Sequence, residues 1–340
     1  MFISNEHILT LGELDGFGPA TVKSIASFIS SSSFNRMSLD DLLDILEDML
    51  EQKLIKGAAK KNFPNKRTLQ EANVRALRVL EESDLAGIMM ISQYDPAFPK
   101  NLLKTVDETG KEAVPMFLFY KGDLSITDKK AVAIIGTREP TPEGISAGEY
   151  ISAQFAKCGF NIVSGLAIGC DTAGHTGALS VPGGSTTAFL AHGLDSVYPP
   201  ENKKLADSIL DNGGLLMSEY PLGMGVNRYN LVARDRLQAG LADATIVIQT
   251  GIHGGTMHAV NATLQARKPL YVVDYSKPVL SEKIQGNNYL KESKGAKGIS
   301  ATNLQDVIKD LTSVPPTDLE SSLATSANSP KEPIQLDLFD

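Results

Sequence analysis

Short apolar runs alternate with longer amphipathic stretches through the middle of the chain. The short runs predict strands, because a strand buried on both faces has few polar positions. These strands are expected at 131–135, 160–163, 186–190, 214–217, 244–248 and 269–273. The amphipathic stretches predict helices at 143–157, 171–180, 201–212, 231–241 and 256–266. Strands that alternate with helices form parallel βαβ units, so the pattern predicts an α/β fold with a doubly wound, mostly parallel sheet.

The segments on either side of this core have different patterns. Residues 1–83 have helical periodicity, and a Gly/Pro turn before Pro19 separates the first two predicted helices. Residues 311–340 are rich in Ser, Thr and Pro, which is typical of a flexible, disordered tail. We therefore divide the chain into a helical domain at 1–83, an α/β domain at 84–310 and a tail at 311–340. Within the second domain, 276–310 are expected to form a smaller appendage.

Composition and charge narrow the class of protein. The 340 residues carry a net charge of −8, which argues against a generally basic nucleic-acid coat but permits a local basic patch. The two cysteines, Cys158 and Cys170, form no metal or disulfide motif, so no metal is expected. No apolar stretch approaches the roughly 20 residues that a membrane helix needs. We expect a cytoplasmic protein with no membrane partner.

Two strand-to-helix turns carry candidate binding residues. Ligands of open parallel sheets bind beyond the carboxyl ends of the strands, where helix N-termini offer free N–H groups to anions. Arg138 would add a guanidinium that matches phosphate geometry. A plain tight turn and, at Asp171, a simple helix cap are the structural alternatives. The candidate phosphate-binding residues on these turns are Gly136, Thr137, Arg138, Ser164, Gly165, Gly169 and Asp171.

Two later segments add cations and glycines. Arg228, Arg234 and Arg236 lie near Tyr229, and such patches bind phosphates and stack bases, although a solvated helix start would look the same. The turn after the strand at 244–248 contributes Gly254, Gly255 and Thr256. The first strand is followed by no G-x-G-x-x-G fingerprint, and the chain contains no G-x-x-x-x-G-K-[ST] motif, so no nucleotide cofactor is expected.

Taken together, these motifs resemble the DprA/Smf (DNA-processing protein A) family over roughly residues 84–300. The matching positions are 94–96, 119–122, 134–138, 163–167, 169–175, 218–221, 234–236 and 286–288. The resemblance implies a Rossmann-like fold that binds single-stranded DNA, commonly as a homodimer, and that loads a RecA-type recombinase without catalysis. It implies that Arg138 and the turn from Gly165 to Gly169 line the DNA pocket, with positive charge from Arg234 and Arg236. Ile168 stands where the family has an arginine.

The two ends of the chain resemble further binding motifs. The segment around Gly16 and Gly18 resembles a helix-hairpin-helix motif, whose backbone amides bind a phosphate without reading sequence. The terminal residues resemble the bacterial sliding-clamp-binding motif, although a tail that packs on its own domain is the alternative. The candidate clamp-binding residues are Gln335, Leu336, Leu338 and Phe339.

Three hypotheses follow from these motifs. The first is a single-stranded-DNA-binding mediator of recombination, DNA processing or transformation. The second is a nucleotide-processing enzyme of the wider superfamily, such as a nucleoside-monophosphate phosphoribohydrolase. Against it, the glycine-rich turn is followed by residues 256–259, which include no carboxylate. The third is a sensor that binds a small nucleotide signal in the same pocket.

Overall fold

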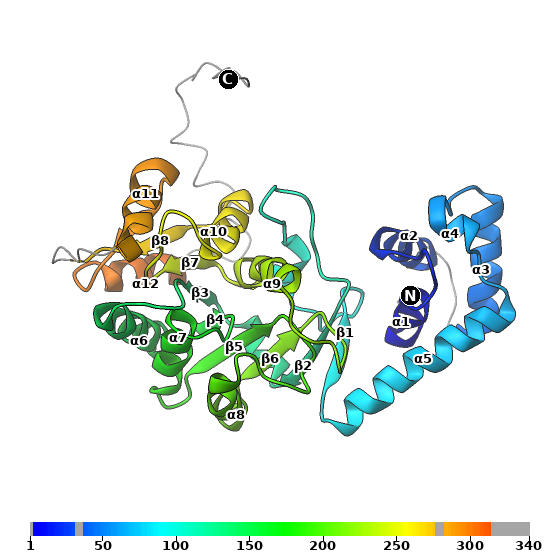
Figure 1. Ribbon diagram of the computed structural model, residues 1–340, viewed down its shortest axis with the longest axis horizontal. Helices are drawn as coiled ribbons and strands as arrows, with labels where there is room; N and C mark the ends of the chain where they lie inside the picture. Colours follow the sequence, from blue (N-terminus) through cyan, green and yellow to red (C-terminus); the bar gives the residue numbers. More distant parts are fainter. Residues whose placement is uncertain (1–2, 31–36, 276–281, 314–340) are drawn as a thin grey trace, which may run out of the picture.

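The protein, seen here in a computed structural model, is described at residues 3–30, 37–275 and 282–313. One nine-stranded sheet runs through it in the order β1-β2-β6-β5-β4-β3-β7-β8-β9 (Figure 1). β1 pairs antiparallel with β2, and β2 antiparallel with β6, whereas all remaining pairs are parallel. The strands are β1 Met89–Ser92, β2 Phe117–Gly122, β3 Ala131–Ile135, β4 Asn161–Ser164, β5 Ser185–Leu190, β6 Leu215–Ser218, β7 Ala244–Val247, β8 Leu270–Val273 and β9 Lys297–Ile299.

The central strands confirm the pattern that the sequence shows. All residues of β3 to β8 are buried, because helices cover both faces of the sheet. β3 and β7 are neighbours, with Ile134 opposite Ile246, although three further strands separate them along the chain. The predicted α/β doubly wound fold is confirmed.

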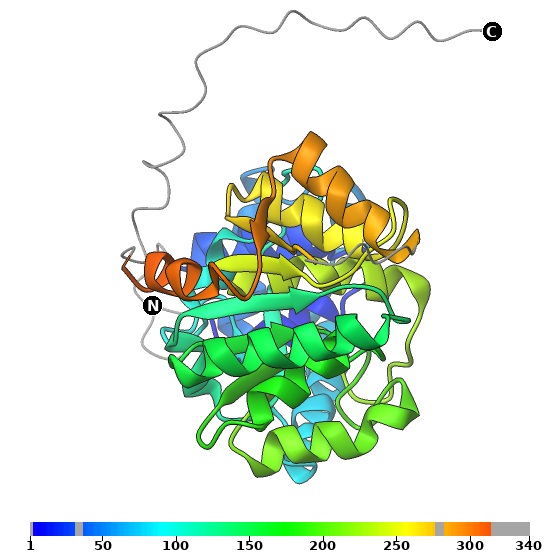
Figure 2. The same ribbon diagram turned by 90° about the vertical axis from the view of Figure 1, so that its left-hand side faces the viewer.

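Helices lie on both sides of this sheet. Figures 1 and 2 show α6, α7 and α8 on one side and α9, α10 and α11 on the other. The α-helices of this part are α6 Pro142–Lys157, α7 Cys170–Leu179, α8 Lys203–Asp211, α9 Arg228–Leu241, α10 Thr256–Gln265, α11 Gln285–Lys294 and α12 Leu304–Ser313. Short 3₁₀ helices span Lys100–Lys104, Leu124–Asp128, Pro200–Asn202 and Glu282–Ile284.

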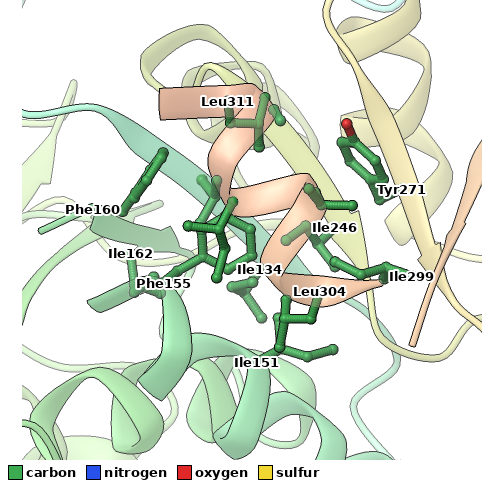
Figure 3. Close-up of a cluster of buried hydrophobic side chains, with 14 of the residues drawn as sticks. Ile134, Ile151, Phe155, Phe160, Ile162, Ile246, Tyr271, Ile299, Leu304 and Leu311 are labelled. Carbon is green, nitrogen blue, oxygen red and sulfur yellow. The ribbon is translucent and has the colours of Figure 1, made fainter. Parts of the chain in front are cut away.

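The last helix and strand belong to the main core. Leu304 and Leu311 of α12 pack with Phe155 and Ile134 in one buried cluster (Figure 3). β9 extends the same sheet next to β8. The expected appendage at 276–310 is therefore corrected for the residues described there, 282–310. The expected start of the tail at 311 is also corrected, because residues 311–313 belong to α12 and Leu311 is buried. β9 escapes a pattern search because it has only three residues, one of them Gly298.

The N-terminal helices form a second buried cluster against the sheet edge. They are α1 Asn5–Gly12, α2 Pro19–Ser30, α3 Leu39–Glu51, α4 Gly57–Lys61 and α5 Lys66–Leu85. Their core includes Leu11, Ile25 and Leu46, and it continues into partly buried Phe117 of β2. Asn5 donates a hydrogen bond to the carbonyl of Met90 in β1 at 2.9 Å. Helix α5 leads from the other N-terminal helices into the sheet, and the buried cluster of these helices is continuous with the side chains of β2. No helix in the described ranges is long and apolar enough to cross a bilayer.

Candidate nucleic-acid interface

A cavity of about 780 Å³ opens at the carboxyl end of the sheet, between the turns that follow β3 and β7. The chain order reverses between these two strands, which is where open α/β sheets bind their ligands. Its volume suits a nucleotide-sized ligand. The structure brings these predicted residues into the lining: Gly136, Thr137, Arg138, Asp171, Arg228, Arg234, Gly254, Gly255 and Thr256.

The turn after β3 is tied to its neighbours by close backbone contacts. Thr137 donates its backbone N–H to the carbonyl of Gln249 at 2.7 Å, and its own carbonyl accepts from the N–H of Cys170 at 3.1 Å. Gly136 has no room for a side chain, because a Cβ there would lie 2.5 Å from the Sγ of Cys170. The turn is thus fixed between two others, and it carries the exposed side chain of Arg138 to the cavity.

The turn after β4 is held by a buried carboxylate. One oxygen of Asp171 accepts hydrogen bonds from the backbone N–H groups of Gly165 at 3.1 Å and Ala167 at 3.2 Å. Burial raises the pKa of Asp171, and the nearby guanidinium of Arg234 opposes that shift. Gly169 then turns the chain into α7 with a φ of +87°. Asp171 is the second residue of α7 and fixes the preceding turn, while the helix N-cap is Gly169; the simple helix cap given as the structural alternative is therefore wrong. Asp171 also lines the cavity.

Two of the predicted arginines donate hydrogen bonds to carbonyl and carboxylate groups of the protein itself. Arg234 is buried, with its side chain 5% exposed, and donates to the carbonyls of Gly165 and Phe189 at 2.5 Å each. Arg236 makes two hydrogen bonds to the carboxylate of Glu219, at 2.8 and 2.6 Å. Arg234 lines the cavity as part of its wall, whereas Arg236 does not line it.

Two other predicted residues also lie outside the lining. Ser164 is fully buried and donates its hydroxyl to the carbonyl of Ile134 at 2.6 Å. Gly169 packs beneath the turn after β3, where a Cβ would lie 2.5 Å from the carbonyl oxygen of Thr137. Both residues support the turns that line the cavity without facing the cavity themselves. Gly165 lines a smaller adjoining hollow.

Arg138 and Arg228 differ from the two internally bonded arginines. Both are exposed, and neither forms an ion pair or a side-chain hydrogen bond with any residue in the described part of the chain. Arg228 begins α9, whose N-cap Asn227 accepts a hydrogen bond from the N–H of Asn230 at 2.8 Å. Two guanidinium groups are therefore available to an anionic ligand.

The turn after β7 leaves space for a close approach. A Cβ on Gly254 or Gly255 would meet nothing within 4 Å, so protein packing does not demand glycine at either position. Gly255 is the N-cap of α10 and makes no side-chain cap hydrogen bond. Asn287 of α11 supports the turn from behind, because its side chain accepts from the N–H of Thr250 at 3.0 Å. An anion has access to backbone N–H groups here.

Sequence reasoning missed several polar residues of the cavity. Asp235 and Gln238 line it from the same face of α9 as Arg228, at helical spacing. Burial raises the pKa of Asp235 to about 6, an effect that Arg234 opposes and Asp171 reinforces. His258 of α10 lies 2.6 Å from Glu108, far away in sequence. The spacing along α9 was a usable signal, whereas the contact with Glu108 has none in the sequence.

A smaller hollow of about 70 Å³ adjoins the cavity. It shares the arginines Arg138 and Arg234 with the cavity and has a mainly apolar wall that includes the half-exposed ring of Tyr198. Its other lining residues are Gly165, Ala167, Ile168, Leu190, Ala191, His192, Pro199 and Leu231.

The N-terminal hairpin forms a separate candidate site. Gly16 has a φ of +82° and packs against α4, where a Cβ would lie 2.7 Å from the carbonyl carbon of Ala58. Gly18 has open space around its Cα. Lys60 and Lys61 are exposed and belong to α4, the helix that packs on the hairpin, so they lie close to it. The clamp-like residues 335–339 lie outside the described residues. In the ranges that the structure describes, no three His, Cys, Asp or Glu side chains gather as a metal site would require.

The comparison with known families agrees with this geometry. The family model of DNA recombination-mediator protein A matches residues 89–312, which include every element around the cavity. The chain belongs to this family. It is 33% identical over 219 residues to DNA processing protein DprA of Streptococcus pneumoniae, covering 64% of this chain and 73% of that protein. It is 36% identical over 192 residues to Protein Smf of Synechocystis, where the match covers 55% of this chain and only 46% of that protein.

Solved structures of this family share the fold. The X-ray structure of DprA from Streptococcus pneumoniae superposes with a TM-score of 0.70 at 26% identity, over 91% of this chain and 99% of that one. DprA from Helicobacter pylori, whose structure describes that protein's single-stranded DNA binding mode, gives a TM-score of 0.56 at 31% identity. That match covers 66% of this chain and 95% of the other. Membership of the DprA/Smf family, expected from the motifs, is confirmed.

Proposed function

We propose that this chain binds single-stranded DNA in the cavity at the carboxyl end of its sheet and acts in DNA recombination or transformation. Arg138 and Arg228 carry the proposal, because they are cations exposed at a cavity in a chain whose net charge is −8. Phosphates would bind these guanidinium groups and the amides after β7. The single-stranded DNA binding described for the Helicobacter pylori relative supports the same reading.

The bases would bind beside the phosphates. Tyr229 follows Arg228 and is 85% exposed, which offers a ring on which a base can stack. Tyr198 adds a second half-exposed ring at the smaller hollow. Stacking of this kind is unavailable in a duplex, so binding should favour single strands.

The test is a fluorescence-anisotropy titration with single-stranded and duplex oligomers at two salt concentrations. Arg138→Ala and Arg228→Ala should each weaken single-strand binding about tenfold, because each removes a charge-assisted phosphate contact. Affinity should fall steeply with salt. The matched control is Arg267→Ala, which removes the same charge from an exposed site beyond the C-terminus of α10, just before β8 begins. Equal losses in all three variants would contradict the proposed site.

Three partners extend this proposal. Family resemblance supports loading of a RecA-type recombinase onto the bound strand and assembly as a homodimer. Residues 335–339 support a contact with the sliding clamp. Recombinase filament assembly on DNA coated with single-strand-binding protein, light scattering of the free chain, and clamp binding after removal of residues 335–339 test them separately.

One observation favours a second function, a nucleotide-processing enzyme. The cavity is lined by the buried carboxylate of Asp171 and the partly buried carboxylate of Asp235, which come from other elements than the turn after β7. Although no carboxylate directly follows the turn after β7, these two carboxylates lie where they could act on the ribose of a bound nucleotide. Incubation with nucleoside monophosphates, scored for free base, decides between the two functions.

A further inference from the structure

Two carboxylates line a cavity that otherwise suits a polyanion, and Asp235 is the more exposed of the two. The Asp235 side chain is 17% exposed and lines the cavity. Its Oδ1 accepts a hydrogen bond from the Nε2 of Gln238 at 3.0 Å and lies 3.2 Å from the Nε of Arg234. Its Oδ2 has no hydrogen-bond partner among the residues that the structure describes. Oδ2 is not sealed from solvent, so it is open to the cavity and available to a hydrogen-bond donor of the ligand.

The carboxylate is held in place by residues that are themselves fixed. Gln238 is 2% exposed, and only its amide nitrogen can face a carboxylate, which fixes the orientation of its side chain. Arg234 is anchored by the backbone carbonyls of Gly165, in the turn after β4, and of Phe189, in β5. A pre-organised acceptor discriminates between ligands more sharply than a mobile one, because no ordering cost is added on binding.

The chemistry of nucleotides limits what Asp235 can accept. Phosphates carry no proton to donate at neutral pH and belong with Arg138 and Arg228. The pairing edge of guanine presents an N1–H and an N2 amino group side by side. These two donors match the two oxygens of a carboxylate, or they can share one oxygen as their acceptor. Thymine presents a single N–H between two carbonyl oxygens, and a carboxylate repels both of these oxygens. Cytosine and adenine each present one amino group and fall between these extremes.

We propose that Asp235 reads the base of the bound nucleotide and that the cavity prefers guanine, whether in a single strand or in a free nucleotide. This inference rests on the proposed function only for the phosphate contacts. It makes binding base-selective, whereas phosphate contacts and stacking alone tolerate any sequence.

The first test changes the ligand and leaves the protein intact. Oligomers of deoxythymidine carry isolated positions occupied by guanine, by hypoxanthine or by thymine, and their affinities are compared by anisotropy. Hypoxanthine keeps N1–H but lacks the amino group of guanine. We expect the guanine oligomer to bind about tenfold more tightly than the thymine oligomer, with hypoxanthine between them. Equal affinities of the three oligomers, with salt-sensitive binding intact, would overturn the inference and leave the proposed function standing.

The second test changes the protein. Asp235→Asn should abolish the difference between guanine and hypoxanthine, because the second carboxylate oxygen is replaced by a donor. Asp211→Asn is the control, since it removes the same charge from an exposed residue at the end of α8, just before β6 begins and thus at the amino end of the sheet, opposite the cavity. A merely structural role for Asp235 would lower the affinity for all three oligomers by the same factor, and that result also overturns the inference.

Free nucleotides separate the two sources of the base. If deoxyguanosine monophosphate competes with the oligomer and thymidine monophosphate does not, the base is read without a strand. If neither competes but the oligomers still differ, the base is read only within DNA. If no oligomer binds at all, the proposed function fails, and a guanine-selective rise in melting temperature with the nucleotides alone would still support the base reading.

Discussion

The cavity at the carboxyl end of the sheet and the N-terminal hairpin both combine glycines with cationic side chains, but the surroundings of these residues differ. At the cavity, turns from three strands and one helix converge, and the backbone of one turn packs on the next. At the hairpin, a single turn packs on the short helix α4, and the lysines there point into solvent. The first arrangement has room to enclose a ligand, whereas the second only offers a charged surface.

The glycines themselves divide into two kinds across these regions. Gly169 and Gly16 have positive φ values and no space for a side chain, so each is required by the packing of the protein. Gly254 and Gly18 have open space around them, so there the missing side chain leaves room for a ligand. A glycine in a sequence motif therefore does not reveal by itself whether it serves the fold or the site.

The largest expected effect comes from Gly169→Ala. The new Cβ would lie 2.5 and 2.6 Å from the carbonyl oxygens of Thr137 and Arg138, and the backbone would also be strained at a φ of +87°. We expect the free energy of unfolding to fall by about 3 kcal/mol and DNA binding to be lost. Urea denaturation measures the first effect and anisotropy the second.

Gly159→Ala provides the control for this substitution. Gly159 has a φ of +83°, but a Cβ there would meet nothing within 4 Å, so only the backbone strain of about 1 kcal/mol applies. Equal destabilisation by the two substitutions would show that the packing of the turns does not support the cavity.

The cavity should also respond to pH, whereas the hairpin should not. Burial raises the pKa of Asp235 to about 6, above the value of about 4 of an unfolded aspartate. Folding therefore favours the protonated form, and the stability that this contributes is present below pH 4 and lost as the pH rises through 6. Asp235→Asn stays neutral, so relative to the original chain it should gain about 2 kcal/mol between pH 4 and pH 7.5.

Urea denaturation at the two pH values measures this difference. The comparison isolates Asp235, since the other titrating groups are common to both chains. A constant offset between the two chains, with no dependence on pH, would mean that the carboxylate is not desolvated in the cavity.

The sequence predicts the sheet well because its strands are buried on both faces. The expected strand at 131–135 matches β3 at Ala131–Ile135, and the five later strands agree within a residue at each end. β1 and β9 were missed, since edge strands of three or four residues carry too little of a pattern. The position of the cavity follows from the order of the strands alone.

The roles of the arginines could not be predicted in the same way. Arg228, Arg234 and Arg236 look equivalent in the sequence, yet only the first is exposed without an internal partner in the described part of the chain. The partners of the other two, such as Glu219 and the carbonyl of Phe189, come from distant strands and turns. Local sequence carries no information on such long-range pairs.

The smallest expected effect tests whether the hairpin acts together with the cavity. Figure 1 places α4 well away from β3 and β7, so one strand of DNA reaches both regions only if it is long. Replacing Lys60 and Lys61 by alanine should weaken binding of a long oligomer about threefold, because exposed lysines make weak, salt-screened phosphate contacts. A short oligomer that fits the cavity alone should bind as before. If the short oligomer loses as much affinity as the long one, the lysines act through the field of the whole protein and the hairpin is no second contact; if neither loses affinity, the cavity alone holds the strand.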